Sequence, residues 1–205
     1  MRRREQIVIS FIRLNDRRRK AVKYAALFRG INVGGKNIVK MDELKQLFSD
    51  LGLLKTKTYI QSGNAVFETD LDEASVQTAI NTGFEERFGF KSKVIIRDIN
   101  EIGALVARLP FSAEELASAE AADPQVEHLY IYFLEHKPTQ AQLNDLGQAY
   151  VGPDALQIGD RDLYLLCHQS IRQSKLAIRT AKEFNSATVR NWNTVSKLYD
   201  MLCAL

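Results

Sequence analysis

Residues 24–37 have the sequence Tyr24-Ala25-Ala26-Leu27-Phe28-Arg29-Gly30-Ile31-Asn32-Val33-Gly34-Gly35-Lys36-Asn37. The first five residues are apolar and predict a buried β-strand. The glycines and cations that follow are typical of a loop in which backbone N–H groups approach an anion. An amphipathic run at 41–51 then predicts a helix that ends at Gly52. A strand, a glycine-rich loop and a helix therefore begin the fold.

The next elements complete a βαββαβ order. We expect two strands joined by a two-residue Ser62-Gly63 turn, then a helix that stops at Gly89, a strand, and a short helix that ends before Pro110. Their predicted ranges are 58–61, 65–68, 72–88, 93–96 and 99–109. In this order the first and second strands are parallel, with the third strand between them.

The same order begins again after residues 110–126, whose Ala, Glu and Pro content predicts a connector. The predicted strands and helices are at 128–134, 139–150, 155–158, 162–167, 174–183 and 190–202. We expect Thr188 to cap the last helix and Arg190 to lie in its first turn. The fold class is therefore α+β, with two plait subdomains, each an antiparallel sheet covered by helices on one face. The predicted division is an extension at 1–22, subdomains at 23–109 and 127–205, and the connector at 110–126.

Charge is concentrated at the N-terminus. Of the 205 residues, 1–20 hold eight basic and two acidic side chains, so the formal net charge of +3 leaves the remainder at −3. A slightly acidic body argues against general binding to nucleic acid, although the tail could bind a polyanion. The apolar run 7–12 in that tail is too short for a membrane span. We expect a cytoplasmic protein with Cys167 and Cys203 as buried thiols.

Two polar loops should meet at one edge of the first sheet. The strands that precede them are parallel and lie one strand apart, so the loops at 29–37 and 61–64 should start about 10 Å from each other. This predicts a shared ligand site. A structural alternative stays open, in which Asn32, Gln61 and Asn64 only satisfy backbone groups of the turns.

The candidate ligand-binding residues form three groups. The anion-contacting loop is Arg29, Gly30, Asn32, Gly34, Gly35 and Lys36, and the ligand-orienting turn is Gln61, Ser62 and Asn64. If the subdomains face each other, a second basic wall is Arg172, Lys175, Arg190 and Asn193. Arg190 has an alternative role in an intramolecular salt bridge. We assign no catalytic residues, no cofactor and no metal, because His128, His136 and His168 lack metal-ligand spacing.

The glycine loop nearly matches the nucleotide-binding P-loop. Gly30-x-x-x-x-Gly35-Lys36-Asn37 has Asn where that motif needs the Ser or Thr that helps to hold magnesium. The predicted element order also lacks the alternating parallel βα units of a P-loop fold. We therefore do not expect an NTPase.

Several motifs together resemble a known family. They are residues 24–37, Met41-x-x-Leu44, Thr58-Tyr59-Ile60-Gln61-Ser62-Gly63-Asn64 and Arg190-Asn191-Trp192-Asn193-Thr194-Val195. Over about residues 23–203 the chain is similar to the bacterial Domain of Unknown Function 1697 family. The resemblance implies two ferredoxin-like subdomains and no established activity, substrate or cofactor. Similar proteins usually carry glycine where Ser170 stands, whereas Arg172, Ser174, Lys175 and Leu176 keep the family pattern.

The sequence leaves three functions open. The first is binding of a phosphorylated or otherwise anionic small molecule at the glycine loop, with or without catalysis. The second is an RNA-binding module whose sheets stack bases on aromatic side chains, for which the strands offer Tyr24, Phe28, Tyr130 and Tyr132. The third is a non-catalytic protein-interaction domain.

Overall fold

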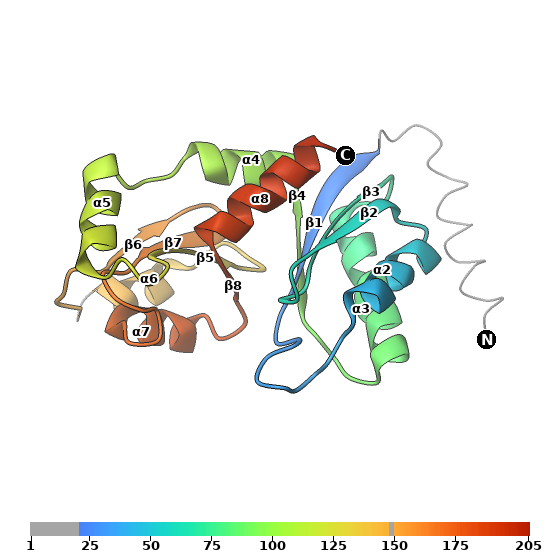
Figure 1. Ribbon diagram of the computed structural model, residues 1–205, viewed down its shortest axis with the longest axis horizontal. Coiled ribbons are helices and arrows are strands. Elements are labelled where there is room, and N and C mark those ends of the chain that lie inside the picture. The colour runs from blue at the N-terminus through green and yellow to red at the C-terminus, as the bar shows by residue number, and fades with distance from the viewer. Residues whose placement is uncertain (1–20, 148–149) are drawn as a thin grey trace.

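The computed structural model describes residues 21–147 and 150–205. Two four-stranded antiparallel sheets lie side by side along the long axis of the molecule (Figure 1). Residues 1–20 of the extension predicted at 1–22 lie outside the described residues, and Val22, which we had included in it, begins the first strand. Within the described residues, no helix has the length and apolar character that crossing a membrane requires.

The first subdomain has the predicted βαββαβ order, and its sheet has the ferredoxin-like order β2-β3-β1-β4. Asp72 caps α3 by accepting a hydrogen bond from Ser75 N (2.8 Å), and Gly89 ends this helix at φ 74°. The elements are β1 (Val22–Phe28), α2 (Met41–Asp50), β2 (Leu54–Tyr59), β3 (Asn64–Thr69), α3 (Glu73–Phe88), β4 (Val94–Asp98) and α4 (Ile99–Ala107).

The turn between β2 and β3 is longer than predicted. The last paired residues are Tyr59 and Asn64, so four residues, not two, connect the strands. Ile60 and Gly63, at the two ends of this connection, both have positive φ, 47° and 79°. The Ser-Gly pair is therefore only the second half of the turn.

The second subdomain repeats the sheet order, as β6-β7-β5-β8. A further helix, α5, precedes this sheet and was missed within the predicted connector, where Ser112 and Glu115 form a capping box. The elements are α5 (Ala113–Ala122), β5 (Leu129–Phe133), α6 (Gln140–Gly147), β6 (Ala155–Ile158), β7 (Asp162–Leu166), α7 (Lys175–Glu183), β8 (Thr188–Asn191) and α8 (Trp192–Cys203).

The prediction for residues 188–191 was wrong, whereas Asn193 lies in the first turn of the last helix, as predicted. Thr188 does not cap the last helix and Arg190 is not in its first turn, because both belong to strand β8, which pairs with β5. Asn191 is the cap instead, and its side chain accepts a hydrogen bond from Thr194 N (3.0 Å). Tertiary pairing along the edge of β5 overrides the local helix signal.

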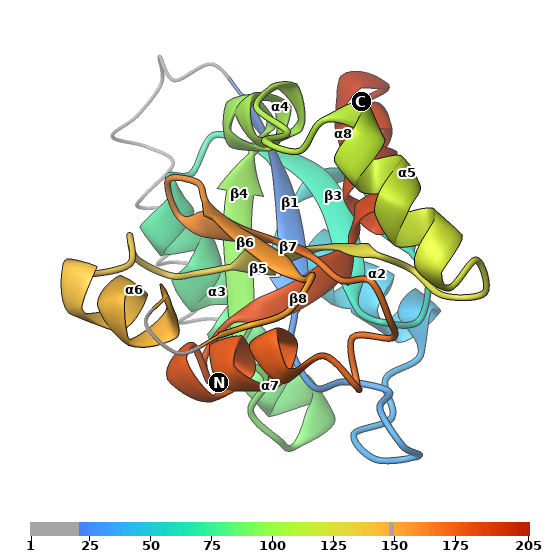
Figure 2. The same ribbon diagram turned by 90° about the vertical axis from the view of Figure 1, so that its left-hand side faces the viewer.

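Helices cover the sheets on both faces, whereas we had expected them on one. In the first subdomain α2 and α3 pack on the outer face of the sheet, and α6 and α7 do so in the second. The inner faces share one core with α4 and α8, which includes Leu27, Ile131 and Leu198. Seen along the long axis, the strands of one sheet lie in front of those of the other (Figure 2).

A buried arginine of the first subdomain reaches into the second. Arg97 is the second-to-last residue of β4 and is only 3% exposed. Its Nη2 donates to the carbonyl oxygen of Leu134, directly after β5, and to that of Arg161 (2.8 Å), directly before β7. The side chain thus joins the ends of two neighbouring strands of the other sheet.

Arg190 makes the same contact in the opposite direction. It is the second-to-last residue of β8, and its Nη2 donates to Phe28 O (2.7 Å) and Gly63 O (3.2 Å). Phe28 ends β1 and Gly63 directly precedes β3. The two subdomains therefore hold each other by two reciprocal arginine contacts.

The strand registers give the same equivalence between the subdomains. Asn64 begins β3 opposite Leu27, and Asp162 begins β7 opposite Phe133. Arg97 pairs with Ala25, two residues before Leu27 on β1. Arg190 pairs with Ile131, two residues before Phe133 on β5. The chain therefore contains two copies of a βαββαβα unit related by an approximate two-fold axis, which the sequence alone indicated only through element order.

Arg97→Met should lower the free energy of unfolding by about 2–4 kcal/mol, because two interior carbonyl groups each lose a hydrogen bond from a charged donor. Urea unfolding of the wild type and the variant measures this difference. The matched control is Arg87→Met, which removes an ion pair with Asp50 at the surface and should cost less than about 1 kcal/mol. Equal losses for the two variants would contradict a special role for the Arg97 contact.

Asp162 should make stability depend on pH. Burial raises the pKa of its carboxyl from 3.8 to about 6, against the opposing effect of Arg97. The folded protein therefore binds more protons than the unfolded chain between about pH 4 and pH 6, so this group's contribution to stability falls as the pH rises through that window. Asp162→Asn removes the effect.

The measurement for Asp162 is the free energy of unfolding of wild type and Asp162→Asn from pH 4 to pH 8. The variant should gain stability relative to wild type as the pH rises, and the gain should level off above pH 7. Asp200→Asn, at an exposed carboxyl, is the control and should show no such trend. A constant difference between Asp162→Asn and wild type would refute the assignment.

Candidate functional site

The glycine-rich loop folds into a small β-hairpin, residues 32–37, here called the glycine hairpin. Asn32 N donates to Asn37 O (3.0 Å), and Lys36 N donates to Val33 O (3.1 Å). Gly34 and Gly35 form the two-residue turn, with φ 58° and 75°. The N–H groups of Asn32 and Lys36 are therefore used within the hairpin, so the predicted anion contact at this loop cannot come from these two groups.

Asn32 joins the two predicted loops. Its Oδ1 accepts a hydrogen bond from Val39 N (2.8 Å), and its Nδ2 donates to Val39 O (2.9 Å) and Gln61 O (2.8 Å). The loops thus lie next to each other, as the parallel placement of β1 and β2 led us to expect. In this conformation the side chain of Asn32 holds backbone groups, which is the structural role left open by the sequence.

Gly63 allows the turn to pack directly on the base of the glycine loop. A Cβ at this position would lie 2.5 Å from Ile31 Cδ1 and 2.9 Å from Phe28 Cβ. Its φ of 79° also falls in the region that favours glycine. A side chain here would therefore separate the two loops.

Arg190 binds both loops from the other subdomain. Its Nε donates to Asn64 Oδ1 (2.6 Å), and its Nη2 donates to the carbonyl oxygens of Phe28, Ser62 (3.0 Å) and Gly63. The Asn64 side chain is fully buried and also donates from Nδ2 to Ser62 Oγ (3.0 Å). Asn64 and Arg190 therefore meet, although they are far apart in the sequence.

The acceptors of Arg190 are all neutral. Burial lowers the pKa of its guanidinium to about 10, and no acidic side chain of the described residues offsets this effect. The group remains protonated at pH 7. Burial, and then the charge of Arg161, also lower the pKa of Arg97. There, however, nearby carboxylates oppose the effect, namely Glu101, 3.9 Å from the Arg97 Nε, with Glu73 and Asp162.

A cleft of about 230 Å³ opens beside Arg190, between the subdomains. The residues that line it come from the base of the glycine loop, from β5, from the end of α7, from β8 and from the segment that joins α7 to β8. They are Arg29, Gly30, Tyr132, Ala181, Phe184, Ala187, Thr188, Val189 and Arg190. Figure 1 shows this segment next to the loop that follows β1.

Two polar groups in the cleft stand out. Thr188 is 1% exposed, and its Oγ1 has no hydrogen-bond partner among the described residues. Arg29 has an exposed side chain on a fixed backbone, since its N–H donates to Lys93 O (2.9 Å) and its carbonyl accepts from Ser92 Oγ (2.9 Å). The cleft therefore combines two cations with an unpaired hydroxyl.

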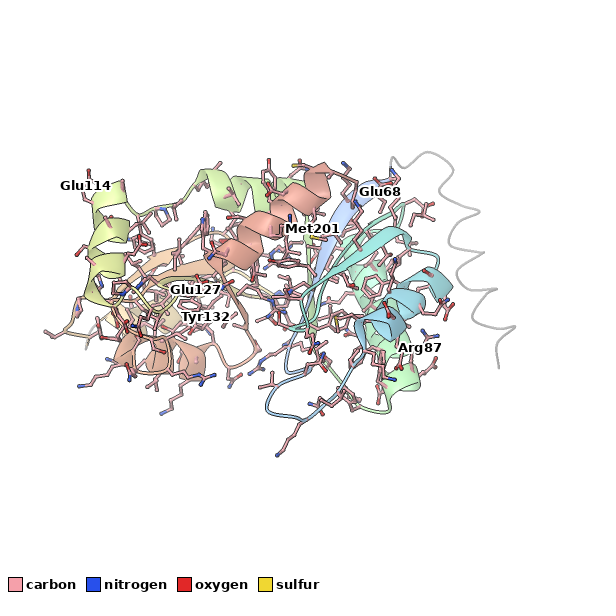
Figure 3. All side chains as sticks on the ribbon, viewed as in Figure 1. Glu68, Arg87, Glu114, Glu127, Tyr132 and Met201 are labelled. Carbon is pink, nitrogen blue, oxygen red and sulfur yellow. The ribbon has the colours of Figure 1, made fainter. Side chains whose placement is uncertain are left out.

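The other predicted wall residues lie elsewhere. Asn193 donates from Nδ2 to Glu127 Oε1 (3.0 Å) within the second subdomain, where Figure 3 labels Glu127 and Tyr132. Arg172 and Lys175 flank the start of α7, while the cleft is at its end, roughly 13 Å away for a nine-residue helix.

The remaining members of the predicted loops are exposed. Gln61 and Ser62 lie on the turn, and Lys36 with its glycines lies at the tip of the hairpin. Of the predicted site residues, the structure thus brings Arg29, Gly30 and Arg190 to one cleft, and Asn64 contacts Arg190 without lining it. Sequence reasoning missed Thr188 and Phe184, because a lone hydroxyl and a helix-ending aromatic leave no pattern.

The aromatic side chains proposed for base stacking are not on an open sheet face. Tyr24, Phe28 and Tyr132 are 6%, 1% and 2% exposed, because helices cover the faces on which they lie. The fourth, Tyr130, is half-buried, and burial raises the pKa of its hydroxyl to about 12.

Histidine and cysteine side chains suggest no metal site within the described ranges, where no cluster of three acidic, His or Cys residues occurs. His128 bonds the carbonyl oxygens of Asp123 and Cys167 through its ring nitrogens (3.0 and 2.7 Å). Cys167 is buried as predicted, whereas Cys203 is exposed.

Comparison with known proteins places the chain in a family. The sequence matches the family described as Protein of unknown function (DUF1697) over residues 22–164. No curated protein matches it. The solved structure of the conserved bacterial protein SP0830 from Streptococcus pneumoniae has a TM-score of 0.67 and 24% sequence identity, and the similarity covers 89% of this chain and 99% of that one, which supports the fold. Since the family match spans more than half of its residues, the chain belongs to the family Protein of unknown function (DUF1697).

Proposed function

We propose that the protein binds a small anionic molecule, such as a phosphorylated compound, in the cleft between its subdomains. Arg190 and Arg29 would supply the positive charge and Thr188 Oγ1 a hydrogen bond. The observation that carries the proposal is the buried charge of Arg190, whose acceptors are all neutral. Burial of an uncompensated charge is costly, and an anion beside it removes that cost.

The internal two-fold axis provides a comparison for this argument. At the Arg97 contact the protein's own carboxylates face the buried cation, and Asp162 stands where the Arg190 contact has Asn64. Neutral Asn64 therefore replaces an acid at the Arg190 contact. An anion from solution would complete there what Asp162 and Glu101 provide at the other end.

Two further positions differ in the same direction. Arg29 follows β1 at the position where Glu135 follows β5, and Glu135 is paired with Lys93 (2.7 Å). Thr188 corresponds by register to Ile95, a fully apolar residue. The Arg190 contact thus has a cation and a hydroxyl nearby, whereas the Arg97 contact has a carboxylate and a hydrocarbon side chain at the equivalent positions. This difference favours a negatively charged ligand at the Arg190 contact.

Arg29→Ala should weaken binding of inorganic phosphate by about tenfold or more, the effect of losing one charge-assisted hydrogen bond. Isothermal titration of wild type and variant with inorganic phosphate measures this loss. Arg172→Ala, an equally exposed cation at the far end of α7, is the matched control and should leave the affinity unchanged. Absence of saturable phosphate binding to the wild type, or equal weakening by both variants, would overturn the proposal.

Thr188→Val provides an independent test with a nearly isosteric side chain. Without ligand the variant should be more stable than wild type, because an unpaired buried hydroxyl is removed. Its phosphate affinity should fall if the hydroxyl meets the anion. Thermal denaturation with and without phosphate reports both effects, and an unchanged phosphate-induced shift would exclude Thr188 from the site.

A further inference from the structure

The cleft has two chemically different walls. Arg29, Arg190 and Thr188 form the polar wall described above. The other lining residues are Tyr132, Phe184, Ala181, Ala187 and Val189, and we call them the apolar wall. A bare inorganic anion would contact only the first of these walls.

The apolar wall is fixed in place by its own contacts. Tyr132 and Phe184 belong to the same buried cluster, and the Tyr132 hydroxyl donates to Ala177 O on α7 (3.3 Å). Ala187 N donates to Phe184 O (2.9 Å), which closes the turn after the helix. The small side chains Ala181 and Ala187 line the cleft between these aromatic groups and the polar wall. This wall is therefore preformed, as in sites for small organic molecules.

The volume of the cleft limits the size of the ligand. At about 30 Å³ for each water molecule, 230 Å³ corresponds to about eight waters. This exceeds the space that a phosphate ion fills, whereas a phosphate joined to a sugar and a base would extend out of the cleft into solvent. One ring or a short branched chain attached to the anion would fill it.

Resting on the proposed function, we propose that the ligand is a small phosphate monoester, or a comparable organic anion, that carries one apolar group. Its anionic end lies at Arg29 and Arg190, and its apolar group lies against Tyr132 and Phe184. The anion supplies the charge that the Arg190 contact lacks, and the apolar group covers the hydrocarbon wall. The two walls together give selectivity for amphipathic anions over both inorganic phosphate and nucleotides.

Titration of the wild-type protein with inorganic phosphate, phenyl phosphate and adenosine monophosphate tests this proposal. Phenyl phosphate should bind at least tenfold more tightly than either of the others. If phosphate binds but phenyl phosphate gains nothing, or if the nucleotide binds most tightly, the inference fails while the proposed function stands. If none of the three binds, both fail.

Ala181→Leu tests the location of the apolar group. Ala181 is exposed on α7 and lines the cleft, so leucine suits the helix and fills the space next to the apolar wall. The variant should lose the advantage of phenyl phosphate, about tenfold, and keep its affinity for inorganic phosphate within twofold. Ala122→Leu, the same change on the exposed surface of α5, is the matched control and should alter neither affinity. Undiminished phenyl phosphate binding by Ala181→Leu would overturn the placement.

Discussion

The guanidinium groups of Arg97 and Arg190 determine how the two halves of the molecule fit together. Each one satisfies carbonyl groups at the ends of two strands in the opposite sheet. Within their own subdomains, Gly63 O accepts a hydrogen bond from Phe28 N (2.8 Å) and Arg161 O accepts one from Leu134 N (2.9 Å). Each arginine therefore adds a charged donor at the point where these two strands are joined. Arg97 and Arg190 each directly precede the residue that caps a helix, α4 and α8 respectively. The same contacts therefore position these two helices, the two sheets and the cleft between the sheets.

The two contacts serve different purposes because their surroundings differ in charge. Around Arg97, Glu101 and Asp162 balance the cation, and Arg161 is itself bound to Glu73 through two hydrogen bonds of 2.8 Å. That end thus supplies its own negative charge. Around Arg190 the partners are an amide and backbone carbonyls, and Arg29 on the lining of the cleft adds a second positive charge. This difference in charge is what our proposal of an anionic ligand at the Arg190 end rests on.

The sequence predicted the fold well where periodicity and turn chemistry agree. The apolar run before Arg29, the helix that stops at Gly89 and the repeated βαββαβ order are all present in the structure. The adjacency of the two polar loops followed from topology alone. Strand β8 was missed, since four residues before a strong helix pattern carry too little signal. The partners of Arg190 were not predictable either, because contacts from a side chain to distant backbone carbonyls leave no trace in residue type.

Because the βαββαβα unit is duplicated, the molecule has two equivalent arginine contacts, and residues around one of them can vary while the other is kept. A single-copy fold must preserve each contact that holds it together, and a ligand site built from such a contact can change little. Here the twin arrangement around Arg97 keeps the halves docked while residues around Arg190, such as Asn64 and Thr188, can diverge. Members of one family could thus share an architecture yet recognise different molecules. Their selectivity would depend on residues around the Arg190 contact, while the Arg97 contact would keep the subdomains together.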